Sequence, residues 1–230
     1  MKNTIKNVAD QAMYTGCAGQ LGRLGRFGML LLVAAGLSAC ALPVPPTRAV
    51  VYDFGPGAVA AAPANRMAAL APIALAEVES SSALDSTAVL YRLAYVDTQA
   101  LRPYAQARWS MAPAQLVRQR LREHLGTGRA VLSSGEGSVI DGVKTSPWLL
   151  RIELEEFSQL FESATASTGL LRLRATVVQA TPQGEKLIGQ RSVIVQRPAP
   201  SPDAAGGVRA LTAATDAVVL EVDQWLQQLR

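Results

Sequence analysis

An apolar segment near the amino terminus decides how much of this chain can contribute to a fold. Residues 27–37 form a run of small and apolar residues (FGMLLLVAAGL), and Arg23 and Arg26 precede it. A basic flank, a short apolar core and small residues at the cleavage point are the parts of a secretory signal. The run is too short to span a bilayer, which needs about 20 apolar residues. We therefore expect residues 1–39 to be a signal peptide that takes no part in the folded domain.

The segment ends in Leu37-Ser38-Ala39-Cys40. These residues resemble the bacterial lipobox, in which the cysteine thiol receives a diacylglycerol, the chain is cut before it, and the new amino terminus is acylated. Several acyl chains anchor a protein stably, whereas a single chain binds only marginally. We therefore predict that Cys40 is lipidated, with palmitate-type chains. The alternative is an ordinary signal peptide followed by a chance cysteine. Residues 1–22 are polar and resemble an upstream extension from a misassigned start codon.

The residues after Cys40 predict a tether. Residues 41–48 (ALPVPPTR) are rich in proline, which favours extended polyproline II and spans about 25 Å at roughly 3.1 Å per residue. Ala41 occupies the position where the bacterial sorting rule uses aspartate to retain lipoproteins in the inner membrane. Its presence predicts anchoring at the periplasmic face of the outer membrane. Residues 40–48 are thus expected to be a lipidated tether and residues 49–230 the folded domain.

Composition excludes several classes of function. Removing 39 of the 230 residues leaves 191, enough for one domain with a proper core. Of the 22 basic and 18 acidic residues, 18 and 17 remain, so a net charge of +1 gives no indication of nucleic-acid binding. Cys17 would be removed with the signal and Cys40 acylated, which leaves no thiol for a disulfide, a metal or catalysis. We expect no disulfide, no thiol nucleophile, no metal and no cofactor.

The single histidine, His124, would have to serve any Ser-His-Asp hydrolase, and a metal site with several histidines is impossible. It falls in the last turn of a predicted helix, where a cation complements the helix dipole. A surface or half-buried structural histidine is therefore the favoured interpretation. Two other motifs are also set aside. Residues 137–145 depart from the phosphate-binding loop because Val143 separates the second glycine from the lysine, and no helix follows. Glu153, Glu155 and Glu156 adjoin one another on a strand and build no cleft.

Alternation of apolar and polar residues predicts a sheet. Along 148–161, Leu150, Ile152 and Leu154 point to one face and Arg151, Glu153 and Glu155 to the other. Residues 170–180 repeat the pattern with Arg172 and Arg174 on the polar face, and a turn at 181–184 predicts an antiparallel hairpin with 187–196. The glutamates could then lie opposite the arginines, as aids to register and solubility. Further strands are expected at 49–54, 73–78, 88–95 and 130–133, while 101–110 is expected to be irregular or a short strand.

Two helices are predicted. The first spans Pro113 to Leu125, because proline suits the first helical position, Ala114, Val117, Leu121 and Leu125 form one apolar stripe, and Gly126 follows. The second begins between Asp203 and Val208. Its stripe comprises Leu211, Thr215, Val218, Val222, Trp225 and Leu229. The predicted fold is a single α/β (α+β) domain, a mixed and largely antiparallel sheet with two main helices packed on it.

Two stretches carry a family resemblance. One is Tyr91-Arg92-Leu93 with the block Tyr104 to Trp109 (YAQARW), then Ala112-Pro113 and its helix; the other is the order of lipobox, proline tether, first strand, helix, strands and terminal helix. Together they resemble the ABC-type transport auxiliary lipoprotein family, which includes the paraquat-inducible lipoprotein C type. The resemblance covers about residues 40–229. Tyr104, Arg108, Trp109 and Pro113 match its most specific part, as a motif of the fold or of an interface, with Trp109 expected to anchor the core.

The resemblance also implies partners. Members of this family are not catalytic, and they work beside an ABC transporter permease and ATPase and an Mce-domain (mammalian-cell-entry) protein that carries lipid across the envelope. The paraquat-inducible type implies a homo-oligomeric ring that docks on the Mce tube. Two alternatives remain open: an assembly or structural lipoprotein of another outer-membrane complex, and a periplasmic hydrolase that uses His124.

Overall fold

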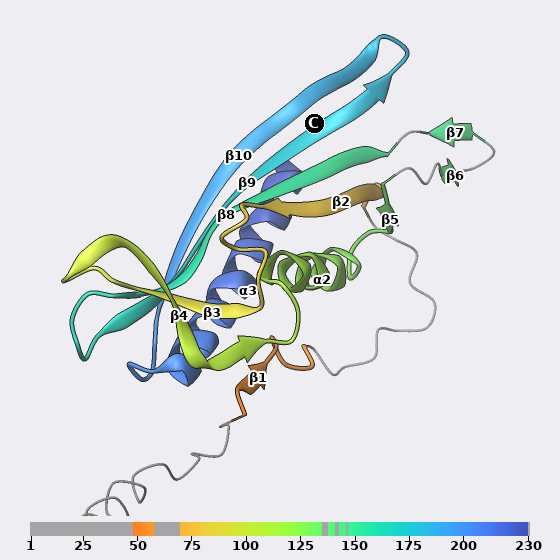
Figure 1. The fold of residues 1–230 in the computed structure, drawn as a ribbon. Coiled ribbons are helices and arrows are strands. Elements are labelled where there is room, and N and C mark those ends of the chain that lie inside the picture. Colours follow the sequence, from red (N-terminus) through yellow and green to blue (C-terminus); the bar gives the residue numbers. More distant parts are fainter. Residues whose placement is uncertain (1–47, 58–69, 135–137, 141–142, 146, 230) are drawn as a thin grey trace, which may run out of the picture. The chain divides into compact units, whose positions relative to one another are not determined.

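The computed structural model of the protein describes residues 48–57, 70–134, 138–140, 143–145 and 147–229 (Figure 1). The predicted signal peptide, Cys40 and almost all of the predicted tether lie outside these residues, so their predictions stay untested. Within the described part of the chain, no helix is both long and apolar enough to cross a membrane.

The centre of the fold is β8 (Trp148–Phe161), a 14-residue strand. Along one side it pairs antiparallel with β9 (Ser167–Thr181), and β9 pairs antiparallel with β10 (Gly184–Pro198). These three long strands form the arm that runs the length of the sheet in Figure 1. The alternation of side chains predicted for 148–161 and 170–180 is confirmed, because Leu150, Ile152, Leu154 and Leu173 are buried.

The other side of β8 is shared between two strands. Its first half pairs parallel with β2 (Ile73–Ser80), and its last residues pair parallel with β3 (Ala88–Leu93). On β2 follows the short parallel strand β5 (Val131–Ser133). On β3 follow β4 (Asp97–Trp109), which is antiparallel, and then β1 (Val50–Tyr52), which is parallel to β4.

The resulting sheet has eight strands and mixed direction, and its longest ladders are antiparallel, so the predicted fold class is confirmed. The strand at residues 97–109 differs from expectation, because residues 101–110 were expected to be irregular or a short strand. Here β4 is 13 residues long, since it has β3 on one side and β1 on the other to hold its backbone hydrogen bonds. β6 (Ser138–Ile140) and β7 (Val143–Thr145) pair antiparallel with each other in a separate two-stranded sheet.

Both helices pack on the same face of the sheet (Figure 1). α2 (Pro113–Leu125) begins and ends at the predicted residues, and it contacts β2 and α3. α3 (Ala204–Gln228) contacts β8, β9 and β10. Its first turn is capped by the Asp203 carboxylate, which accepts a 2.7 Å hydrogen bond from the Gly206 amide. That bond, with a second from Ser201, lowers the pKa of Asp203.

Two glycines let α3 approach the sheet closely. A Cβ at Gly169 in β9 would lie 2.6 Å from the Ala210 carbonyl carbon. A Cβ at Gly207 would lie 2.1 Å from Oε1 of Gln159, a side chain of β8. The first turns of α3 therefore lie directly against the β9 backbone at Gly169 and against the Gln159 side chain of β8.

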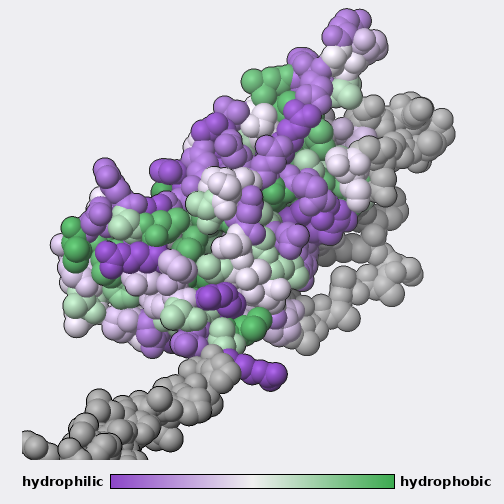
Figure 2. Space-filling model, viewed as in Figure 1, coloured by the Kyte–Doolittle hydropathy of each residue, from purple (hydrophilic) through white to green (hydrophobic). Residues whose placement is uncertain are grey.

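The opposite face of the long arm carries a ladder of charges. Arg172 Nε lies 3.0 Å from Glu155 Oε2, and Arg174 lies 3.4 Å from Glu153 and also contacts Glu155. The predicted pairing of these glutamates and arginines is therefore confirmed. Because both arginines are largely exposed, each pair is worth about 0–1 kcal/mol. Figure 2 shows a mostly hydrophilic surface along this arm, interrupted by a hydrophobic patch on its upper part, and further hydrophobic surface toward the β3–β4 end.

Candidate functional site: the dock of the amino-terminal segment

The segment that follows the predicted tether, residues 49–55, enters the domain along the edge of the sheet. We call its contacts with β4, β8 and α2 the dock. β1 pairs with the end of β4, with Val50 opposite Ala107 and Tyr52 opposite Trp109. The Ser110 amide extends this ladder with a 2.7 Å hydrogen bond to the Tyr52 carbonyl. Val50 and Val51 remain 52% and 64% exposed, so β1 is held by its backbone pairing and by Tyr52, which is partly buried against the core.

Phe54 is the side chain that fastens this segment to the core. It is buried, and its ring centre lies 5.6 Å from that of Trp109 in an edge-to-face arrangement and 6.2 Å from that of Phe157. Trp109 and Phe157 are themselves 5.6 Å apart. Aromatic pairs of this geometry add about 0.5–1.5 kcal/mol beyond the area they bury. The cluster joins residues from three places in the chain: the segment after β1, β4 and β8.

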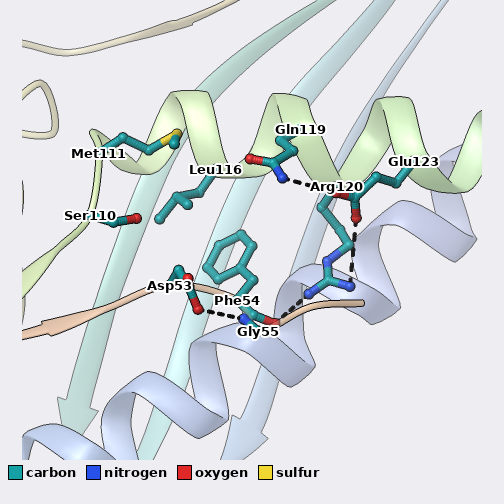
Figure 3. A pocket seen from close by; sticks show the side chains of 9 residues that line it. All are labelled: Asp53, Phe54, Gly55, Ser110, Met111, Leu116, Gln119, Arg120 and Glu123. Atoms are coloured by element: carbon teal, nitrogen blue, oxygen red, sulfur yellow. Dashed lines mark hydrogen bonds and ion pairs between the residues drawn. The ribbon is translucent and has the colours of Figure 1, made fainter. Parts of the chain in front are cut away.

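Arg120 of α2 closes the dock from above (Figure 3). Its guanidinium lies 5.8 Å from the Phe54 ring centre, within the range of a cation–π interaction, and donates a hydrogen bond to the Phe54 carbonyl oxygen. Asp216 of α3 lies 3.3 Å from its Nε, and Glu123 lies 3.9 Å from its Nη1. One side chain thus connects the entering segment with both helices.

A pocket of about 230 Å³ lies beside these contacts. Its walls come from the segment after β1, the loop before α2, and α2 itself; they are Asp53, Phe54, Gly55, Ser110, Met111, Leu116, Gln119, Arg120 and Glu123 (Figure 3). Asp53 is engaged as an acceptor of a 2.8 Å hydrogen bond from the Gly55 amide, which forms the turn that leaves β1. Gly55 has φ +72°, a conformation that favours glycine. The charged groups of this pocket therefore serve the turn and the Arg120 contacts.

The block from Tyr104 to Pro113 does not converge on one spot. The Tyr104 hydroxyl donates a 2.8 Å hydrogen bond to Gln159, whose amide in turn donates to Ser167 at 2.8 Å. Burial raises the pKa of Tyr104 above its ordinary value, and the neighbouring Tyr91 and Asp203 add to the rise. Tyr104 and Trp109 thus serve two separate clusters on the helix-covered face.

The other two residues of the block are structural in their contacts. Arg108 folds back on its own strand and donates to the carbonyl oxygens of Tyr104 and Ala107. Pro113 is the buried first residue of α2. Trp109 is 2% exposed, as expected for a core anchor, and its indole Nε1 is buried without a hydrogen-bond partner among the described residues.

Among the described residues, the recorded contact of the His124 side chain is with Asp223. Its Nε2 lies 3.5 Å from Asp223, which is shared with Arg129 at 3.0 Å, and the His124 side chain is 31% exposed. The contact between His124 and Asp223 joins the end of α2 to α3. Among the residues that the structure describes, no group of three or more His, Cys, Asp or Glu side chains could hold a metal ion.

Sequence reasoning missed Phe54, Phe157 and Arg120. The signal for Phe54 was its position directly before Gly55-Pro56-Gly57, where an apolar residue ends an exposed edge strand. Arg120 sits inside the helix LVRQRLREHL among five other polar residues, and nothing in the local pattern sets it apart.

The fold and this site define a class: a single α/β domain whose amino-terminal segment is locked onto the edge of the sheet. The chain belongs to the family of ABC-type transport auxiliary lipoprotein components, whose model matches residues 52–223. The match includes the dock, since it begins at Tyr52 and runs into α3.

Solved structures share the fold. A crystal structure of a Xanthomonas campestris protein of family DUF330 is similar with a TM-score of 0.55 and 18% identity, covering 80% of this chain and 88% of that one. A second crystal structure, of an uncharacterized protein, has a TM-score of 0.56 and 14% identity and covers 78% of this chain and 99% of that one. No curated protein matches the chain.

Proposed function

We propose that this protein is an outer-membrane-anchored periplasmic lipoprotein and a non-catalytic auxiliary component of an Mce-type ABC lipid transport system. The observation that carries the proposal is the family match over residues 52–223, directly behind Cys40 and its proline-rich tether. An auxiliary lipoprotein needs an anchor, a spacer and a domain that contacts other proteins, and the chain has a candidate for each part in that order.

The dock supports the anchoring role. A tether can orient a domain only if its end is fixed to that domain, and β1 begins at Val50, two residues after the tether's last position, Arg48. The parallel pairing with β4 and the burial of Phe54 then transmit the attachment to the core. Without them the domain would hang on a longer chain, whose reach grows with length.

Copurification tests the proposed partners. The acylated full chain, tagged at its carboxyl terminus, would be extracted from membranes of its own host in mild detergent, and the copurifying proteins identified by mass spectrometry. We expect an ABC permease, its ATPase and an Mce-domain protein. Capture of an outer-membrane β-barrel in their place would favour the assembly lipoprotein, and absence of all of them would contradict the proposal.

The proposed lipid anchor in the outer membrane has its own test. Cys40→Ser removes the thiol that would be acylated, and we expect this variant to lack the mass of the acyl chains and to fail to localise to the outer membrane. Ala41→Asp keeps the cysteine and, by the sorting rule, should move the protein to the inner-membrane fraction of a density gradient. Outer-membrane localisation of both variants would contradict the proposal.

The last proposed partner is the protein itself, in a homo-oligomeric ring. β10 supports it, since among the described strands it pairs only with β9, and its outer edge is open to another chain. Leu187 and Ile194 are each 60% exposed on this strand. We expect light scattering to give an oligomer that Ile194→Asp disrupts, whereas Val96→Asp, on the β3–β4 turn, leaves it intact. A monomer at high concentration would contradict the ring.

A further inference from the structure

A second and larger pocket lies at the other end of the helix layer. It has a volume of about 430 Å³ and opens where the parallel strands β2 and β8 begin and α3 ends. The lining residues come from these ends and from the segments next to them: Leu70, Ala71, Pro72, Ile73, Arg129, Pro147, Trp148, Leu226, Gln227 and Leu229. It shares no lining residue with the pocket at the dock.

The lining is apolar apart from two side chains, Arg129 and Gln227. Ile73 and Leu226 are buried at its base, and Trp148 is half-buried in its wall. Small-molecule sites are typically cavities of about 300–1,000 Å³ with apolar walls and a few placed polar groups. This pocket has that volume and that composition.

Arg129 gives the pocket its polarity. Its side chain is 7% exposed, and Nη2 lies 3.0 Å from Asp223 Oδ1. Its Nε is buried and has no hydrogen-bond partner among the described residues. A buried charged donor without a partner is costly, and a carboxylate or phosphate oxygen is the acceptor that a guanidinium fork binds best. The Asp223 carboxylate also lies 3.5 Å from His124, so Arg129 shares this partner with a second side chain.

We propose that this pocket binds one acyl chain of an anionic amphiphile, with the chain against Trp148 and Leu226 and a carboxylate or phosphate oxygen at Arg129. The inference rests on the proposed function, because it names the class of lipid that an auxiliary component of lipid transport would touch. Charge complementarity selects the head group, and the apolar walls select the chain.

The test uses the acylated full chain in nanodiscs of zwitterionic phospholipid, with dibrominated stearic acid as the probe. Bromine quenches tryptophan fluorescence at short range, and Trp148 lines the pocket. We expect saturable quenching that is largely lost in Trp148→Phe. Quenching that rises linearly with probe and is equal in Trp148→Phe would mean that the probe is only in the bilayer, and would overturn the proposal.

Variants separate the chain from the head group. Ala71→Phe fills the exposed rim of the pocket without changing the Arg129–Asp223 pair, and we expect it to bind the brominated acid at least tenfold more weakly. Leu220→Phe is the matched control, because Leu220 is exposed on α3 away from the pocket, and it should bind the acid as the parent does. Arg129→Gln should weaken binding of the acid about tenfold and leave the methyl ester unchanged. Equal binding of acid and ester by the parent would overturn the role of Arg129.

Competition identifies the source of the anion. Displacement by lysophosphatidic acid but not by inorganic phosphate supports an amphiphile, whereas displacement by inorganic phosphate alone would overturn the acyl part. Circular dichroism of each variant confirms that it is folded. If the transporter subunits fail to copurify but saturable quenching is retained, the result counts against the proposed function alone. If the subunits copurify but no saturable quenching is seen, the result counts against this pocket alone.

Discussion

Arg120 and Phe54 are 66 positions apart in the chain, and the Arg120 side chain both covers the Phe54 ring at 5.8 Å and donates to its carbonyl oxygen. The ring thus contacts a cation and the aromatic side chains of Trp109 and Phe157. The arrangement makes the first core residue after the tether part of the same cluster as the central strand.

Phe54→Ala tests how firmly the entering segment is attached. We expect a loss of about 3–5 kcal/mol in the free energy of unfolding, because the change removes a buried ring and leaves a cavity. Urea denaturation would measure it. Val51→Ala in the same segment is the control, since that side chain is 64% exposed and should cost less than about 0.5 kcal/mol. Equal effects of the two changes would show that Phe54 does not fasten the segment.

Gly207→Ala tests the close contact between α3 and β8. A Cβ would lie 2.1 Å from Gln159 Oε1, so we expect a net loss of about 1–3 kcal/mol, although alanine is the better helix former. In a double-mutant cycle with Gln159→Ala the loss should shrink, because the clashing amide is gone. Additive effects of the two changes would contradict the contact. Thermal unfolding of the four proteins measures the coupling.

Tyr104 predicts how stability changes in alkali. Burial raises the pKa of Tyr104 in the folded protein above the value near 10 of an unfolded chain. The unfolded state then releases the phenolic proton first, so this contribution is fully present below about pH 10 and is lost as the pH rises toward the folded pKa. Tyr104→Phe should flatten the fall of the unfolding free energy above pH 10. An unchanged slope would contradict the raised pKa.

Asp203 predicts the opposite response in acid. Hydrogen bonds from the Gly206 amide and from Ser201 lower the pKa of Asp203. Its contribution is present above the unfolded pKa near 3.9 and is lost as the pH falls through the folded value. Asp203→Ala should cost about 0.5–2 kcal/mol at neutral pH, as removal of a helix cap does, whereas Asp203→Asn keeps an acceptor and should cost less. Equal losses for both would rule out the cap, with chemical denaturation as the measurement.

Much of the fold followed from local pattern. Pro113 and Gly126 mark the ends of α2 because proline suits the first turn and glycine ends a helix. The alternation of β8 and the turn at 181–184 predicted the antiparallel arm, since residues i and i+2 of a strand share a face. In the site, Trp109 was expected to anchor the core because large aromatic side chains usually do so. Each of these features is decided by neighbours within a few positions.

By itself, the sequence determined both helices, most strands and the faces that they bury, with β4 as the exception, because these features depend on residues that are close along the chain. It also predicted the lipid anchor. Only the tertiary structure decided that β8 divides its free side between β2 and β3, that Phe54 lies under Arg120, and that Arg129 reaches an apolar pocket beside Trp148. The physical reason is that strand partners and buried charges are chosen by contacts between residues far apart in the chain, and periodicity carries no information about which distant face a segment will meet.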